Sequence, residues 1–165
     1  MILSPDQPCY SNAFAAVPRT VEAIENLSVE ERLRLLWAVY KSIEGLVVPL
    51  FPSSAKRNGL VGSLSHQVAN LPYQEQVQFL HDLLKQVRTP LTRDYGILSS
   101  NAKLAFWYEL AEQMSSREAN RDPESYQLSA PAHAVFEQVM TLQLSQQIAV
   151  LRLITGKMGI NPLKV

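Results

Sequence analysis

Asn101-Ala-Lys-Leu-Ala-Phe-Trp-Tyr-Glu-Leu-Ala-Glu-Gln-Met114 is the stretch that decides the fold class, because it has the pattern of an amphipathic helix with three aromatic residues in a row. The aromatic residues are Phe106, Trp107 and Tyr108. At about 100° per residue, three consecutive positions cover about 200° of a helix surface, whereas one contact with a core needs an apolar stripe of about 100°. We therefore predict a helix with apolar surroundings on more than one side.

Helical periodicity recurs on both sides of this stretch. Ser28 and Glu31 form a capping-box pattern ahead of an apolar row that ends near Gly45 and Pro49. No run alternates apolar and polar residues in the manner of a half-buried strand. We therefore predict an all-α chain. Its other helical segments are expected at about 60–71, 72–87, 132–142 and 146–157, with a short segment at 91–97.

The first residues differ in composition from the rest of the chain. Pro5, Pro8 and Pro18 stand among Ser and Asn residues, which favours an extended arm over residues 1–18, followed by a helical core over residues 19–160. A chain of 165 residues fits one domain that buries roughly 70% of its unfolded surface. No repeat at a fixed period and no flexible linker is visible, so residues 1–165 are predicted to form a single domain.

Charge and cysteine content exclude several classes of protein. Fifteen basic and fifteen acidic residues balance, and no basic cluster suited to nucleic acid is visible. Cys9 is the only cysteine, so the chain forms no internal disulfide and a cysteine-based zinc site is not expected. No apolar run approaches the length of a bilayer span, and no secretory signal pattern opens the chain. A cytoplasmic protein without a membrane span is expected.

Catalytic and metal-binding motifs are not visible. His66, His81 and His133 lack the spacing of metal ligands, and the Gly59-x-x-Gly62 pattern lacks the Lys-Ser/Thr of a phosphate loop. Neighbouring glutamates such as Glu30 and Glu31 are expected on solvated helix flanks rather than in acid–base catalysis. No local signature of a nucleophile and its base is present either. The chain is therefore predicted not to be an enzyme.

Two apolar seams contain both tryptophans of the chain. Such stripes favour a packed core over the wall of a ligand site, yet tryptophan also offers a rigid face for stacking on a conjugated ligand. The pattern leaves both interpretations open. One seam consists of Leu33, Leu36, Trp37 and Tyr40, and the other of Leu104, Trp107, Tyr108, Ala111 and Met114.

The residues of these seams also carry a resemblance to a known family. The stretch 101–114 resembles the matching helix of the orange carotenoid protein N-terminal domain, a light-protective family of cyanobacteria. The resemblance runs in order over nearly the whole chain, which looks like a stand-alone helical carotenoid protein. Its other matching segments are Leu36-Trp-Ala-Val-Tyr40, Thr89-Pro-Leu91, Tyr126-Gln-Leu-Ser129 and Gln146-Gln-Ile-Ala-Val-Leu-Arg152.

The resemblance implies an all-α fold of two interleaved, discontinuous four-helix bundles with a carotenoid tunnel between them. The implied cofactor is a ketocarotenoid: canthaxanthin, echinenone or 3′-hydroxyechinenone. Its implied function is photoprotection, in which the pigment quenches singlet oxygen or phycobilisome excitation and releases the energy as heat. Because the resemblance ends before the family's C-terminal domain, we expect a constitutively active protein without a photocycle.

The resemblance also implies site residues by motif match. Arg152 matches an arginine that in the family pairs with the C-terminal domain or, once exposed, with the phycobilisome. Contact with the phycobilisome would place the protein on the cytoplasmic face of the thylakoid membrane. Two alternatives stay open: a carrier that exchanges pigment with a C-terminal-domain homologue, and a helical protein–protein interaction module. The implied carotenoid contacts are Leu33, Leu36, Trp37, Tyr40, Leu80, His81, Leu104, Trp107, Tyr108, Ala111, Met114, Pro123, Tyr126 and Ile148.

Overall fold

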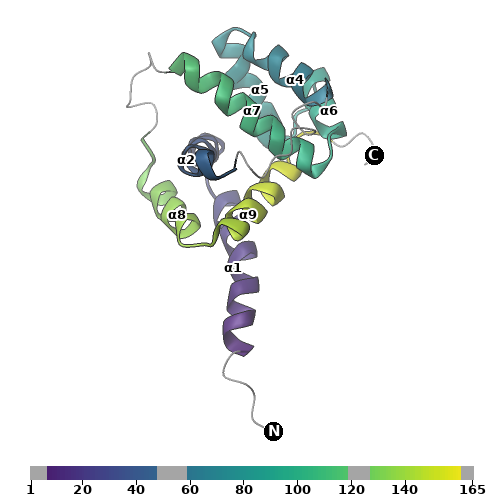
Figure 1. Ribbon diagram of the computed structural model, residues 1–165. Coiled ribbons are helices and arrows are strands. Elements are labelled where there is room, and N and C mark those ends of the chain that lie inside the picture. The colour runs from purple at the N-terminus through teal and green to yellow at the C-terminus, as the bar shows by residue number, and fades with distance from the viewer. Residues whose placement is uncertain (1–6, 48–58, 119–126, 161–165) are drawn as a thin grey trace.

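The computed structural model describes residues 7–47, 59–118 and 127–160, and within these ranges it contains eight helices and no strand (Figure 1). The prediction of an all-α chain is confirmed. The helices are α1 (Gln7–Glu25), α2 (Val29–Val47), α4 (Gly59–Ala69), α5 (Tyr73–Lys85), α6 (Pro90–Ile97), α7 (Ser100–Glu118), α8 (Ala130–Met140) and α9 (Leu144–Gly156).

The first helix corrects the expectation of an extended arm over residues 1–18. α1 begins at Gln7 and continues through Pro18. Pro8 lies in the first turn, where its missing N–H has no acceptor within the helix. Pro18 removes one backbone hydrogen bond, but the alanine-rich sequence before it has high helix propensity, and the hydroxyl of Thr20 donates to the carbonyl oxygen of Ala16 at 2.7 Å. The expected arm is therefore wrong for residues 7–18, and residues 1–6 lie outside the described ranges.

The ends of two other helices can be compared with the sequence pattern. α2 ends at Val47, between Gly45 and Pro49 as expected, and α7 continues beyond Met114 to Glu118. A glycine inside a helix costs about 1 kcal/mol relative to alanine. Gly45 is nevertheless tolerated inside α2, because packing of an apolar helix face against its neighbours outweighs such a local preference.

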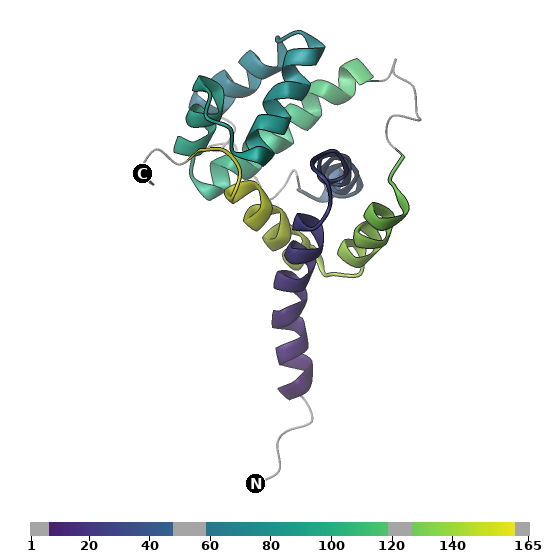
Figure 2. The same cartoon turned by 180° about the vertical axis from the view of Figure 1, so that it is seen from behind.

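The helices pack as two groups of four. α1 contacts α8 and α9, and α2 contacts α8, whereas α4, α5 and α6 contact one another and α4 contacts α7. Figures 1 and 2 show α4 to α7 gathered at one end and α1 projecting from the other. The two groups join where α7 packs on α9 and where α2 packs on α5 and α7. The arrangement places α2 and α7 at the junction, while a carotenoid tunnel there remains a prediction.

Three helices recur later in the chain with unchanged length. α2 and α7 each have 19 residues, α4 and α8 each have 11, and α5 and α9 each have 13. Their contacts recur as well, since α2 packs on α8 and α5 just as α7 packs on α4 and α9. We call α1, α2, α4 and α5 the first half and α6 to α9 the second half. One constant spacing, which we call the repeat interval, separates the paired starts: Val29 and Ser100, Gly59 and Ala130, and Tyr73 and Leu144.

Hydrogen bonds at the helix turns support this internal repeat. The buried side-chain amide of Gln76 donates to the carbonyl oxygen of Val68 at 2.9 Å, and that of Gln147, one repeat interval later, donates to the carbonyl oxygen of Val139 at 3.1 Å. The prediction that the chain has no repeat is therefore corrected. The sequence hides the repeat because the side chains at most equivalent positions differ in size or polarity.

Candidate functional site

The two tryptophans meet where α2 packs on α7. The ring centroids of Trp37 and Trp107 lie 5.6 Å apart with their planes at 60°, an edge-to-face arrangement that aromatic pairs favour. Trp107 has no exposed surface, whereas Trp37 is half-buried. Since α2 and α7 are equivalent helices, this contact joins the first half of the chain to the second half.

A chain of hydrogen bonds holds the indole of Trp107. Its Nε1–H donates to the hydroxyl oxygen of Tyr95 at 3.0 Å, and the Tyr95 hydroxyl donates to the carbonyl oxygen of Thr155 at 2.7 Å. The chain joins α7 to α6 and α9. Burial raises the pKa of Tyr95, so the phenol stays neutral and keeps its proton available for donation. The orientation of the Trp107 ring is therefore fixed by polar contacts as well as by packing.

The remaining aromatic surface of α7 is covered by protein. Phe106 is fully buried, and its ring makes edge-to-face contacts with Phe79 at 6.2 Å and with Tyr95 at 5.4 Å between centroids. Every residue from Ala102 to Tyr108 is buried. The prediction of apolar surroundings on more than one side of this helix is confirmed, because α2, α4 and α9 all pack against α7.

Two polar side chains are buried beside the aromatic residues. The hydroxyl of Tyr40 donates to the carbonyl oxygen of Leu104 at 3.3 Å and links α2 to α7, and burial raises the pKa of Tyr40. The ammonium of Lys103 donates to the carbonyl oxygen of Gly156 at 3.1 Å, and burial lowers the pKa of this lysine. The carbonyl end of a helix attracts a cation, which explains why Lys103 ends at the last turn of α9.

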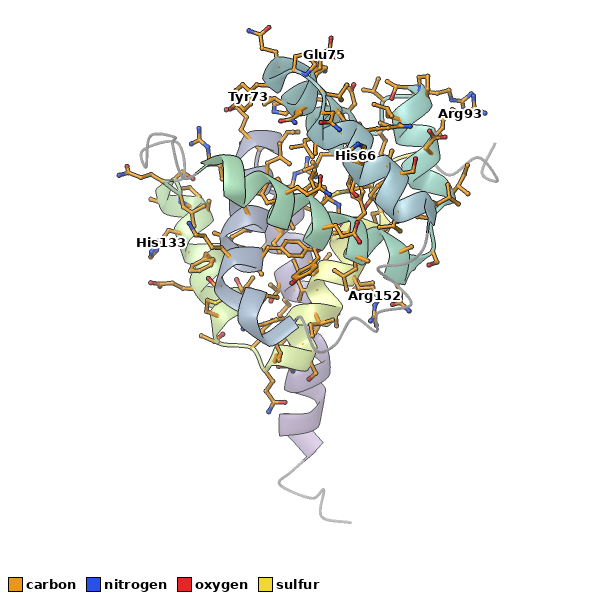
Figure 3. All side chains as sticks on the ribbon, turned by 45° about the horizontal axis from the view of Figure 1, so that its top comes forward. His66, Tyr73, Glu75, Arg93, His133 and Arg152 are labelled. Atoms are coloured by element: carbon orange, nitrogen blue, oxygen red, sulfur yellow. The ribbon has the colours of Figure 1, made fainter. Side chains whose placement is uncertain are left out.

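The structure gathers most of the site residues named above in one core. Arg152 lies outside it, exposed on α9 (Figure 3). The side chain of Met114, and Pro123 and Tyr126, lie outside the described residues. Of the others, Leu33, Leu36, Tyr40, Leu80, Leu104, Trp107 and Tyr108 are buried, and Trp37, His81, Ala111 and Ile148 are half-buried.

Two core residues of this region could not be found from the sequence. Tyr95 and Thr155 are 60 positions apart, and nothing local to either residue signals their hydrogen bond. The repeat also shows that the two seams are equivalent surfaces, because the repeat interval that separates α2 from α7 also separates their residues. The equivalent pairs are Leu33 with Leu104, Leu36 with Trp107, Trp37 with Tyr108, and Tyr40 with Ala111.

The described ranges also bear on metal binding and membrane insertion. No group of three or more His, Cys, Asp or Glu side chains there is placed to hold a metal ion. No helix in the same ranges is long and apolar enough to cross a bilayer.

Together, the fold and the site define a helical domain of two four-helix groups with an aromatic core at their junction. The family described as Orange carotenoid protein, N-terminal, matches residues 11–161. The chain therefore belongs to the orange carotenoid protein N-terminal family. That family is named for carotenoid binding rather than for a catalytic activity.

Relatives in cyanobacteria support this assignment. An orange carotenoid-binding domain-containing protein of Nostoc sp. strain PCC 7120 is 36% identical over 93% of this chain and 92% of its own length. The orange carotenoid-binding protein of Synechocystis sp. strain PCC 6803 is 36% identical over 91% of this chain, which spans about half (48%) of that relative. A solved structure, the red carotenoid protein of Anabaena (Nostoc) sp. PCC 7120 binding canthaxanthin, matches with a TM-score of 0.73 and 31% identity, over 87% of this chain and 97% of its own.

Proposed function

We propose that this protein binds a ketocarotenoid and protects against light by converting excitation energy into heat. The pigment is canthaxanthin, echinenone or 3′-hydroxyechinenone, and the energy comes from singlet oxygen or from an excited phycobilisome. Family membership supports carotenoid binding, and a relative of similar fold is described as binding canthaxanthin.

The observation that carries the proposal is the edge-to-face contact between Trp37 and Trp107 at the α2–α7 junction. Equivalent seams from both halves meet there, so a conjugated rod running along this junction would contact aromatic and aliphatic side chains of both α2 and α7. Burying a polyene against such surfaces contributes about 25 cal/mol for each Å² removed from water. Such contacts both dissolve the pigment and restrict its motion.

The proposed carotenoid contacts are the seam residues together with contacts from α5, α9 and the segment before α8. No side chain has to titrate in this mechanism, because the pigment performs the photophysics and the protein supplies its surroundings. The contacts are Leu33, Leu36, Trp37, Tyr40, Leu80, His81, Leu104, Trp107, Tyr108, Ala111, Met114, Pro123, Tyr126 and Ile148.

The decisive experiment is expression in a host that makes canthaxanthin or echinenone. We expect a broad, red-shifted visible band that co-elutes with the protein during size-exclusion chromatography. A colourless, folded helical protein would refute pigment binding and would favour a helical protein–protein interaction module.

A second experiment addresses constitutive activity. We propose that the holoprotein is constitutively active and has no photocycle. The match to a red carotenoid protein described as binding canthaxanthin, over 97% of that chain, supports pigment binding by such a domain. Spectra recorded in darkness and under strong blue light should superimpose. A reversible difference between them would contradict this part of the proposal.

The exposed face of α9 is the proposed partner-binding surface. Arg152 is exposed there and is proposed to contact the phycobilisome, which would place the protein on the cytoplasmic face of the thylakoid membrane (Figure 3). Fluorescence quenching of isolated phycobilisomes should weaken in Arg152→Glu, whereas singlet-oxygen quenching should not. Pigment transfer on mixing with a C-terminal-domain homologue would instead support a carrier function.

A further inference from the structure

The hydrogen-bonded chain beside Trp107 occurs in only one of the two equivalent halves. The repeat interval relates Tyr95, Trp107 and Thr155 to three apolar residues of the first half. The backbone is the same at the first of these positions: the amide of Leu27 donates to Ile24 at 3.1 Å, and that of Leu98 donates to Tyr95 at 3.0 Å. The three apolar equivalents are Ile24, Leu36 and Leu84, all buried.

Packing alone therefore does not require the polar chain. Ile24, Leu36 and Leu84 belong to the hydrophobic core without any side-chain hydrogen bond. Burying a phenol and an indole N–H demands that each be satisfied, since an unpaired buried donor costs about 1–3 kcal/mol. The second half thus contains a hydrogen-bonded chain that is absent from the equivalent backbone of the first half. This difference indicates that the chain has a role other than stability.

The surroundings hold the ring of Tyr95 in one place. Gly159 has a φ of 76°, and a Cβ atom there would lie 2.7 Å from Cδ1 of Tyr95, so only glycine allows the backbone to approach the ring this closely. On another side, the ammonium of Lys103 lies 5.5 Å from the centroid of the same ring. The hydroxyl of Tyr95 is therefore fixed relative to α9 and can serve as a rigid acceptor for Trp107.

We propose that Tyr95 is a positioning residue that orients the Trp107 indole against Trp37 and thereby sets the electronic environment of the bound pigment. The proposal rests on the proposed function for its second step. Its first step, the orientation of Trp107, concerns the protein alone and is measurable without pigment. Tyr95 itself is not proposed to touch the carotenoid.

The first test uses Tyr95→Phe without pigment. The indole N–H of Trp107 is followed by ¹⁵N–¹H NMR, with Trp37→Phe used to assign the signal, and Tyr73→Phe on the exposed start of α5 as the matched control. In Tyr95→Phe, the Trp107 proton signal should move upfield, whereas it should stay in place in Tyr73→Phe. An unchanged signal in Tyr95→Phe would overturn the proposal whether or not the protein binds pigment.

The second test uses the canthaxanthin-loaded protein. Tyr95→Phe should retain the wild-type ratio of pigment to protein but show a shifted absorption maximum and a weaker visible circular dichroism band. Superimposable spectra would overturn the proposal, while a colourless wild type would refute pigment binding and leave the NMR result standing.

A double-mutant cycle distinguishes positioning of Trp107 by Tyr95 from a general loss of packing. Its other single variant, Trp107→Phe, remains informative if Tyr95→Phe folds poorly. Trp107→Phe removes the same hydrogen bond from its donor side and leaves the Tyr95 bond to Thr155 in place. If Tyr95 acts through Trp107, adding Tyr95→Phe to Trp107→Phe produces no further spectral shift. Additive shifts would show that Tyr95 acts independently and would contradict the proposal.

Discussion

The two halves of this protein consist of equivalent helices, but they hold their tryptophans in different ways. In the second half, Trp107 is fully buried and hydrogen-bonded to Tyr95, which is itself bonded to Thr155. In the first half the equivalent positions are aliphatic, and Trp37 lies one position further along its helix, half-buried. The difference indicates that the repeat supplies the scaffold, and that departures from the repeat create the chemical character of the site.

The halves also differ in the polar groups that attach their helices. On the α2 side, the carboxylate of Glu31 accepts hydrogen bonds from the hydroxyl of Ser129 at 2.5 Å and from the amide of Ser28 at 3.1 Å. This contact joins the start of α2 to the start of α8 near solvent. The α7 side relies on the neutral, buried phenol of Tyr95. Acid should therefore weaken the contact of Glu31, and alkali the contact of Tyr95.

Replacement of Trp107 by alanine should have the largest effect on this comparison. Removing a fully buried indole leaves a cavity, so the free energy of unfolding should fall by about 3–5 kcal/mol. Denaturant titration followed by far-ultraviolet circular dichroism measures the loss. Pigment loss with retained helicity would mark Trp107 as a ligand contact, whereas loss of the fold together with the pigment would show that it serves the core alone.

Replacement of Trp37 by alanine should be milder for stability and severe for pigment binding. Because this side chain is half-buried, we expect a loss of about 2 kcal/mol in the free energy of unfolding. The ratio of pigment to protein should nevertheless fall strongly. A variant that loses as much stability as Trp107→Ala but keeps its pigment would contradict the contrast between the two tryptophans.

Alkaline stability should report on Tyr95. Its pKa is raised by burial, so above about pH 10 the unfolded chain loses the phenolic proton while the folded protein keeps it, and stability falls as pH rises. Tyr95→Phe should show a shallower decline between about pH 9 and 11. Equal slopes for wild type and Tyr95→Phe would exclude this contribution.

Acid stability should report on Glu31, with the smallest effect of the series. Its pKa is lowered, first by the hydrogen bond from Ser129 and then by that from the Ser28 amide. Stability from this carboxylate is thus present above its ordinary pKa of 4.5 and is lost as pH falls below that value. Ser129→Ala should flatten the acid branch of the thermal-melting profile. A branch as steep as that of the wild type would contradict the assigned cause.

The sequence was sufficient for the fold class and for the seams. Three- and four-residue spacing predicted the helices around Trp37 and Trp107, and the aromatic stretch predicted the crowded position of α7. The match over residues 11–161 confirms the family resemblance. Many of the site residues that the resemblance implies lie in one core, and their contact with a carotenoid remains a prediction. These signals are local or follow one helix face, which explains their success.

Features that depend on distant residues were missed. The proline at position 18 misplaced the start of the first helix, because packing overrides local propensity. The internal repeat was hidden because side chains differ at most equivalent positions. The hydrogen bond from Tyr95 to Thr155 joins residues 60 positions apart, and no spacing rule connects them. Such contacts arise only when α6, α7 and α9 have packed.

The most direct test of the central claim is a crystal structure of the protein loaded with canthaxanthin. We expect the polyene to lie at the α2–α7 junction in van der Waals contact with Trp37 and Trp107, and the indole of Trp107 to keep its hydrogen bond to Tyr95. Pigment bound elsewhere, with the two tryptophans contacting only protein, would contradict the account and reduce the aromatic seams to ordinary core.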